Sequence, residues 1–382
     1  MKIGIFLSAR KPTDGGGYTI TKDLFDSILK LYPKKKFYFI IRGKGNSYFK
    51  NMLQKNGFDY TIIKISKFEI FIKSLIAILF KSIFNFKDNL DNILKIKKVD
   101  CLIFLSSENF YPLKTPYVST IWDIQHLTNP YFKETGSILI KLYRHIVLKA
   151  FLKNSKKIIV GTDVGKKEIK KFYKIYDNLF YKLPHPTPKI FFKEKKTRFN
   201  LKIFKKNNFF IYPANFWEHK NHILLLEAIK QINLKYKKKI NLVLVGSIKN
   251  ILHFNKIKKF IEINKLKKNI KIIKFVSLKK LIQLYDYSEG LIYASSSGPE
   301  NLPPLEAFAR GKNVIISNYS GSREQLNNFA NYFNLKKKSS IEEKILNFKK
   351  FNSKDLKSYA RLKSTDSYIK NLIKKVERDF SV

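Results

Sequence analysis

Short apolar runs alternate along most of the chain with longer stretches in which apolar residues recur every three or four positions. The short runs are rich in Ile, Val, Leu and Phe, which is typical of strands buried on both faces of a parallel sheet. The longer stretches predict amphipathic helices. This alternation predicts doubly wound α/β architecture. The predicted strands are Lys2–Ser8, Lys36–Ile41, Tyr60–Ile65, Val99–Leu105, Tyr117–Ile121, Lys157–Gly161, Phe209–Pro213, Ile240–Gly246, Ile270–Phe275, Gly290–Ala294 and Asn313–Ser317.

The predicted strands fall into two sets, and the 382 residues are enough for two domains. Between the sets, Pro184, Pro186 and Pro188 precede a charged, irregular segment. Prolines spaced in this way cannot continue a helix or a central strand. We therefore expect an N-terminal domain over residues 1–190 and a C-terminal domain over residues 191–382. The last helix, about 354–382, is a candidate to pack back on the N-terminal domain.

The charge of the chain adds a question about its partners. The chain has 76 Lys plus Arg against 29 Asp plus Glu, a net charge of +47, and only eight of the basic residues are Arg. One interpretation is a gene biased toward A and T, since Ile, Asn, Phe and Tyr are also abundant. The other is attraction to an anionic membrane or to nucleic acid. The scarcity of Arg and the absence of a recognisable nucleic-acid module disfavour a specific nucleic-acid partner.

Cysteine content and hydropathy indicate the compartment. Cys101 is the single cysteine, so no disulfide within the chain and no cysteine zinc cluster is expected. No run of about 18 uncharged apolar residues predicts a spanning helix. The segment Phe68–Phe84 is strongly apolar but contains Lys73 and Lys81. It predicts either a helix lying at an anionic membrane surface or a buried domain helix with two snorkelling lysines. We expect a cytoplasmic protein, either free or in peripheral contact with the inner face of the membrane.

Two segments of the first half have the residue types and positions of a ligand site. Three glycines, including Gly16 and Gly17, follow the first predicted strand and precede a helix. Such a turn lets backbone approach a phosphate at a helix N-terminus, although it is equally compatible with a flexible loop. Asp123 and His126 follow the strand Tyr117–Ile121 and offer hydrogen-bonding groups suited to sugar hydroxyls. The alternative there is a capped loop with a surface histidine.

Two segments of the second half offer stronger chemistry. Lys220 and Asn221 follow the strand Phe209–Pro213 and precede a helix, where a lysine can neutralise a leaving diphosphate. The alternative is one solvated lysine among many.

Ser295–Gly311 follows another strand and opens a further helix. Backbone amides around Asn301 and Leu302 can hold a sugar or a phosphate. Glu306, expected early in the helix, can accept the two vicinal hydroxyls of a ribose. The alternative is a carboxylate that only complements the helix dipole.

Together these segments resemble the retaining glycosyltransferases of family 4, which have the GT-B fold. The likeness runs from the glycine turn to about Phe333 and is most specific in Tyr212–His222 and Gly298–Gly311. Residues 123–126 resemble a motif of one branch of that family. The resemblance implies an α/β fold of two Rossmann-like doubly wound parallel-sheet domains facing a cleft, with the nucleotide held by the C-terminal domain. The implied roles are donor phosphates for Gly16 and Gly17, the sugar pocket for His126, the diphosphate for Lys220 and the ribose for Glu306.

Two positions depart from the family pattern. Gly298 stands where many members have Glu, and the nearby Glu300 is displaced by two residues. Asn215 stands where many members have Arg. Both positions remain candidates for donor binding. They indicate either a branch with a different phosphate clamp or a protein with reduced activity.

The expected function is transfer of a hexose from a nucleotide diphosphate sugar to the hydroxyl of a sugar or lipid-linked acceptor. The resemblance implies retention of anomeric configuration, no obligatory metal or other cofactor, and a role in surface polysaccharide synthesis. Three alternatives stay open: a nucleotide-sugar epimerase on the same fold, a basic nucleic-acid-binding protein, and a catalytically silent sugar binder.

Overall fold

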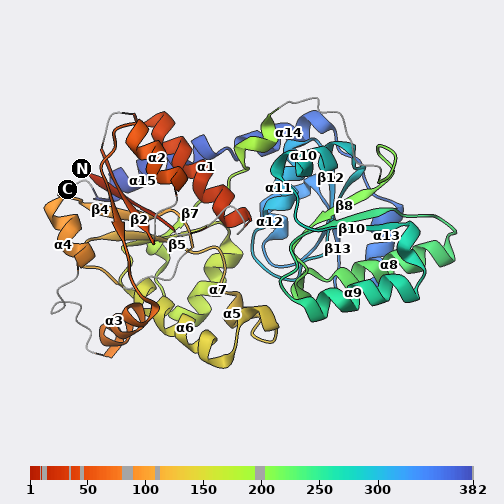
Figure 1. Cartoon of the computed structure of the whole chain (residues 1–382), viewed down its shortest axis with the longest axis horizontal. Coiled ribbons are helices and arrows are strands. Elements are labelled where there is room, and N and C mark those ends of the chain that lie inside the picture. The colour runs from red at the N-terminus through yellow and green to blue at the C-terminus, as the bar shows by residue number, and fades with distance from the viewer. Residues whose placement is uncertain are drawn as a thin grey trace. The chain divides into compact units, whose positions relative to one another are not determined.

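The computed structural model describes residues 1–8, 10, 15–33, 36–43, 47–79, 89–107, 112–193 and 203–380. The chain divides into two compact units (Figure 1). The first unit comprises Met1–Pro130, Thr135–Pro186 and Thr365–Val382. The second comprises Tyr131–Glu134 and Thr187–Ser364. A short piece of the first half of the chain, residues 131–134, thus belongs to the second unit.

The division between the units falls at Pro186, where 190 was expected. Of the segment 354–382, only α15 (Thr365–Phe380) belongs to the first unit, and α14 (Ser353–Leu362) stays with the second. Hydrogen bonds to Asp366 of α15, from Ser27 Oγ (2.8 Å) and Lys30 Nζ (2.7 Å), help to hold α15 against α1 (Gly16–Leu31).

Within the described residues, the first unit has a seven-stranded parallel sheet in the order β3-β2-β1-β4-β5-β6-β7. Its helices include α1, α2 and α15 near one face and α3, α6 and α7 near the other (Figure 1). The strands are β1 (Ile3–Leu7), β2 (Phe37–Arg42), β3 (Tyr60–Ile63), β4 (Cys101–Phe104), β5 (Tyr117–Thr120), β6 (Lys157–Val160) and β7 (Phe180–Lys182). The remaining helices are α2 (Ser47–Lys55), α3 (Lys67–Leu79), α4 (Asn89–Ile96), α5 (Gln125–Thr128), α6 (Ile138–Lys153) and α7 (Asp163–Tyr173).

Aromatic side chains pack against one face of this sheet. Phe6 of β1 pairs in register with Phe104 of β4, and their ring centroids lie 4.7 Å apart. The Phe104 ring also meets Phe151 of α6 edge-on at 4.9 Å. All three side chains are buried, so this face is a continuous apolar core under α6.

The second unit has a six-stranded parallel sheet in the order β10-β9-β8-β11-β12-β13 among the residues described. Its strands are β8 (Phe210–Pro213), β9 (Leu242–Val245), β10 (Ile270–Ile273), β11 (Gly290–Tyr293), β12 (Asn313–Ser317) and β13 (Asn331–Phe333). Its other helices are α8 (His222–Lys235), α9 (Ile251–Ile263), α10 (Leu278–Tyr287), α11 (Leu302–Ala309), α12 (Ser322–Leu326) and α13 (Lys338–Leu346). In each unit the first three strands follow one another toward one edge of the sheet. The fourth strand then pairs with the first strand on its other side, so β4 lies beside β1 and β11 lies beside β8. The loops after β8 and β11 therefore leave neighbouring strands at the same sheet edge, the usual ligand position in such sheets.

The predicted α/β class with two Rossmann-like parallel sheets is confirmed. All eleven predicted strands are present, Asn313–Ser317 with the predicted ends and the other ten with shifted ends. The sequence analysis missed β7 and β13, edge strands of three residues each, which are too short for a period-two pattern. Among the helices of the described ranges, none is both long and apolar enough to cross a membrane.

Candidate functional site

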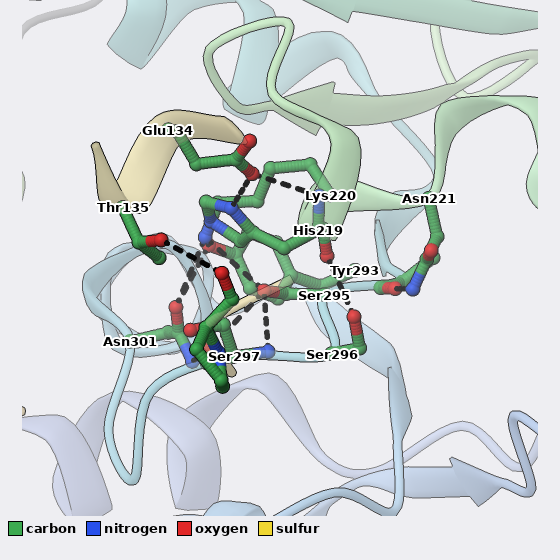
Figure 2. Close-up of polar contacts among 12 residues, drawn as sticks. Glu134, Thr135, His219, Lys220, Asn221, Tyr293, Ser295, Ser296, Ser297 and Asn301 are labelled. Atoms are coloured by element: carbon green, nitrogen blue, oxygen red, sulfur yellow. Dashed lines mark hydrogen bonds and ion pairs between the residues drawn. The ribbon is translucent and has the colours of Figure 1, made fainter. Parts of the chain in front are cut away.

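The loops that follow β8 and β11 are bound to each other (Figure 2). The first loop contains a single 3-10 turn, η5 (Glu218–Lys220), and ends at Asn221, whose left-handed conformation (φ 50°) leads into α8. Asn221 Nδ2 donates to the carbonyl of Ala294, at 2.9 Å. The Ser296 amide donates to the carbonyl of His219 at 2.8 Å. These bonds fix the turn that contains Lys220 against the end of β11.

Lys220 is half-buried, and its ammonium lies among oxygen atoms from the β11 side (Figure 2). Lys220 Nζ donates to Tyr293 OH (2.9 Å), Ser295 Oγ (3.2 Å) and Asn301 Oδ1 (3.4 Å). Tyr212 OH donates to the Lys220 carbonyl at 2.5 Å. The sequence analysis treated a solvated surface lysine as the alternative, but this side chain is directed toward the sheet edge.

Asn301 immediately precedes α11 and links Lys220 to the side-chain amide of Gln325. Its Oδ1 accepts from Tyr293 OH at 2.9 Å. Its backbone amide donates to Gln325 Oε1 (3.1 Å), and Gln325 Nε2 donates back to its carbonyl (2.8 Å). The Asn301 amide is therefore already used within the protein, contrary to the expectation of exposed amides here. Leu302, the first residue of α11, is buried.

Glu306 lies in the middle of α11, later than expected, and is only 8% exposed. Tyr285 OH donates to its Oε2 at 2.9 Å. Burial raises the pKa of Glu306 to about 7, and the hydrogen bond from Tyr285 offsets part of that rise. Burial, followed by the charge of Glu306, raises the pKa of Tyr293, whose hydroxyl accepts from Lys220. Tyr293 thus interacts with both Lys220 and Glu306.

The two departures from the family pattern have local structural consequences. Asn215 Oδ1 accepts from the Ser247 amide at 3.1 Å, so the side chain connects the loops after β8 and β9. Gly298 has φ +85°, a conformation that L side chains rarely adopt. A glutamate at Gly298 would be strained in this backbone, whatever space is available.

In the first unit, the glycine turn and the segment after β5 meet at an arginine that the sequence analysis did not single out. Gly16 is the first residue of α1, after Gly15 in a positive-φ conformation. A Cβ on Gly17 would lie 2.6 Å from Arg10 Nη1 and 3.1 Å from Trp122. The Arg10 guanidinium stacks on the Trp122 ring at 5.2 Å. The structure therefore brings the two predicted segments together, with Gly17 packed closely against Arg10 and Trp122.

Asp123 and His126 do not lie together. Asp123 is exposed, and its Oδ1 accepts at 3.0 Å from the amide of Gln125, the first residue of the short α5. His126 is 2% exposed, and its ring nitrogens have no hydrogen-bond partner among the described residues. Burial, followed by the charges of Arg144 and His145, lowers the pKa of His126 to about 3. His126 is therefore a neutral imidazole beside α6.

His222, the first residue of α8, is a core side chain. It is fully buried between the rings of Tyr212 and Phe216, each at 5.0 Å. Burial, followed by the charge of His253, lowers the pKa of His222 to about 3. His222 thus supports the site by packing rather than by contact with a ligand.

The sequence analysis missed Tyr293, Ser295, Gln325 and Arg10 as site residues. Tyr293 and Ser295 stand at the end of a strand that the sequence predicted, which is the signal that could have identified them. Gln325 and Arg10 carry no such signal. In the described ranges, no group of three or more His, Cys, Asp or Glu is arranged to hold a metal ion.

Comparisons with known proteins agree with this geometry. Residues 193–365, which contain Lys220 and Glu306, match the family model described as Glycosyl transferases group 1. The O-antigen chain mannosyltransferase RfbU of Salmonella typhimurium is 25% identical over 252 residues, 66% of this chain and 65% of RfbU. The aligned part is thus less than two thirds of that relative.

Solved structures resemble the whole chain. A glycosyltransferase from Rickettsia africae has a TM-score of 0.68 and 17% identity, over 99% of this chain and 98% of that one. Anabaena Alr3699/HepE in complex with UDP and glucose has a TM-score of 0.69 and 14% identity, over 99% and 100%. At these identities the likeness shows the fold, which is that of the GT-B glycosyltransferases. The C-terminal unit contains a glycosyltransferase domain.

The buried His222 predicts how the second unit responds to pH. Its folded-state pKa lies below the ordinary value of 6.5, so its contribution to stability is complete above pH 6.5 and is lost as pH falls toward 3. We expect the free energy of unfolding to fall by about 1.4 kcal/mol per pH unit from this group. His222→Phe should remove that part of the slope. Urea unfolding from pH 7 to pH 5, followed by Trp217 fluorescence in a Trp122→Phe background, measures it. His185→Gln is the control, and an unchanged slope in His222→Phe would contradict the assignment.

Proposed function

We propose that this chain, a glycosyltransferase of the GT-B fold, transfers a hexosyl group from a nucleotide diphosphate sugar to an acceptor hydroxyl. The observation that carries the proposal is the Lys220 ammonium, directed onto Tyr293, Ser295 and Asn301 between the ends of β8 and β11. A donor in this position would place its diphosphate beside a fixed positive charge. The UDP and glucose bound to Alr3699/HepE, a protein of the same fold, support a donor of this class.

The chemistry requires stabilisation of charge on the departing diphosphate. The three side-chain oxygens that accept from Lys220 Nζ are neutral, so these contacts orient the cation without cancelling its charge. Retention of configuration, with the leaving phosphate helping to deprotonate the acceptor, follows the resemblance to family 4. The proposal assigns no protein nucleophile and gives Lys220, rather than a metal, the role of neutralising the phosphate. Glu306 would accept the ribose hydroxyls.

The acceptor class is proposed from the relative. RfbU is an O-antigen chain mannosyltransferase, which supports a sugar or lipid-linked acceptor in surface polysaccharide synthesis. A thermal-shift screen of UDP-hexoses and GDP-hexoses tests the donor class. A donor that stabilises the protein should then be consumed slowly without acceptor and yield no epimer. Formation of an epimer would favour the epimerase. Binding of the donor without its consumption, whichever acceptor is added, would favour a catalytically silent sugar binder.

We also propose that the first unit contacts an anionic bilayer on the cytoplasmic side. The helices α3 and α6 pack together, with the Phe71 and Tyr143 rings stacked at 5.7 Å. Beside this contact, Phe68 of α3 is 74% exposed, and Ile138 and Leu139 of α6 are 81% and 77% exposed. Consecutive exposed apolar residues on a chain of net charge +47 suit an interface of lipid tails and anionic headgroups.

The lysines expected at this surface need one revision. Lys73 donates to Glu69 at 3.0 Å, and its side chain is 14% exposed, so it is largely occupied within α3. Lys81 lies outside the described residues. The start of α6, which the sequence analysis did not single out, therefore becomes the main apolar contact of the proposal.

Lys220→Ala should lower turnover by about a hundredfold or more, because it removes a cation from the developing leaving group. The assay is release of nucleoside diphosphate from the hexose donor selected by thermal shift. Lys239→Ala, an exposed lysine of the same unit, is the control and should retain activity. Retention of activity within threefold in Lys220→Ala would make the assignment wrong.

Glu306 gives nucleotide binding a pH dependence of known sign. The carboxyl group has a pKa of about 7, so it ionises as pH rises from 6 to 8 and becomes a better acceptor for ribose hydroxyls. We expect the affinity for UDP or GDP to rise by up to about tenfold over that range. Glu306→Gln should bind more weakly and lack this component. The ratio of wild-type to variant affinity, from calorimetry at each pH, cancels titration of the nucleotide, and a constant ratio would refute the role.

Vesicle sedimentation tests the bilayer contact. We expect binding to vesicles of equal phosphatidylcholine and phosphatidylglycerol that weakens at high salt. The pair Ile138→Ser with Leu139→Ser should reduce it several-fold, because two apolar side chains leave the interface. Leu234→Ser is the control, because it replaces an exposed apolar side chain (65% exposed) on α8 of the second unit. Equal binding to pure phosphatidylcholine would overturn the proposed attraction to anionic headgroups. Unchanged binding of the Ile138→Ser, Leu139→Ser variant would overturn the proposed insertion of these apolar side chains.

A further inference from the structure

A carboxylate from the first half of the chain is buried against the turn that contains Lys220. Glu134 is the last residue of Tyr131–Glu134, the piece that belongs to the second unit. Its Oε1 accepts from the His219 amide at 3.1 Å and lies 2.5 Å from His219 Nδ1 (Figure 2). The two side chains are only 5% and 9% exposed. The Phe132 ring meets the His219 ring edge-on at 5.7 Å.

The contact places a charge-assisted anchor on the residue before Lys220. His219 is held at its amide and ring by Glu134, and at its carbonyl by the Ser296 amide (2.8 Å) and hydroxyl (3.2 Å). The carbonyl of Lys220 accepts from Tyr212 OH at 2.5 Å. The peptide groups on both sides of the Lys220 Cα are therefore fixed.

The carboxylate is suited to this task because it stays ionised. Burial by itself raises the pKa of Glu134, but the hydrogen bonds from the His219 ring and amide outweigh burial and leave it below the ordinary value. A short bond to an ionised acceptor is stronger and more directional than one between neutral groups. Loss of Glu134 would release the His219 ring and amide together, and the turn could then rotate.

We propose that Glu134 is a positioning residue that acts through His219 to aim the Lys220 ammonium at the donor diphosphate. This inference rests on the proposed function, because it assumes that Lys220 binds the diphosphate. It makes a prediction that a merely structural contact does not. Loss of Glu134 should weaken ligands that have a diphosphate and spare ligands that lack one.

The test compares UDP and GDP with uridine and guanosine, which have the same base and ribose. In Glu134→Ala, affinity for the wild type's preferred diphosphate should fall on the order of tenfold, while affinity for the matching nucleoside stays within twofold. Glu134→Gln keeps the length and an acceptor oxygen, so it should fall less. Calorimetry measures the diphosphates, and ligand-observed NMR measures the nucleosides. Glu227→Gln, a carboxylate on α8 paired with Lys338 at 2.8 Å, is the matched control.

A second background separates action through Lys220 from a direct effect. In Lys220→Ala the further change Glu134→Ala should alter diphosphate affinity by less than about threefold, because the cation it positions is gone. An equal loss in both backgrounds, or an equal loss for nucleoside and diphosphate, would overturn the inference. If Glu134→Ala does not fold, Glu134→Gln and His219→Gln decide by the same comparison. Failure of the wild type to bind either diphosphate would instead refute the proposed function.

Discussion

The hydrogen bonds between the loops after β8 and β11 are the constraint on which the site of the second unit depends. Parallel strands end at a common edge, and β8 and β11 are neighbours because the chain restarts on the far side of its first strand. Asn221 and Ser296 close the space between the two loops with bonds to backbone carbonyls. Lys220 lies between the bonded residues, so its ammonium has few directions available. The sheet topology places the two loops next to each other, and these hydrogen bonds then fix their relative position.

The opposite side of the same loop is held by close backbone packing. A Cβ on Gly246 would lie 2.0 Å from the carbonyl oxygen of Ala214, so only glycine allows the ends of β8 and β9 to approach this closely. Asn215 then accepts from the Ser247 amide across the gap. A residue that stands where family members often have a cation is therefore used to fasten one loop to another. This change leaves Lys220 as the cation on this loop that contacts the β11 side.

The sequence could predict the sheets because their strands are buried on both faces and read as continuous apolar runs, as in β9 and β11. It could also predict that Lys220 lies beside the end of a strand, because its segment follows such a run, whereas Glu306 lies further along its helix than the sequence indicated. It could not predict Glu134, whose partner His219 is 85 residues away and whose own neighbourhood has no motif. His126 shows the reverse limit: its segment has the right position after β5, but tertiary packing encloses the ring beside α6. The local sequence pattern predicts at which sheet edge the strand ends lie. Only tertiary packing decides which side chains there are buried and which face a ligand.

Two buried glutamates of the second unit have opposite pKa shifts, and the difference lies in their donors. Glu134 has the ring and amide of His219, and its pKa is lowered in spite of burial. Glu306 has the hydroxyl of Tyr285, a neutral donor, and burial raises its pKa to about 7. A carboxylate with strong internal donors stays ionised and serves as a fixed anchor. A carboxyl group near its midpoint at neutral pH gains most from further donors, so of the two it is Glu306 that is suited to accept hydroxyls from a ligand.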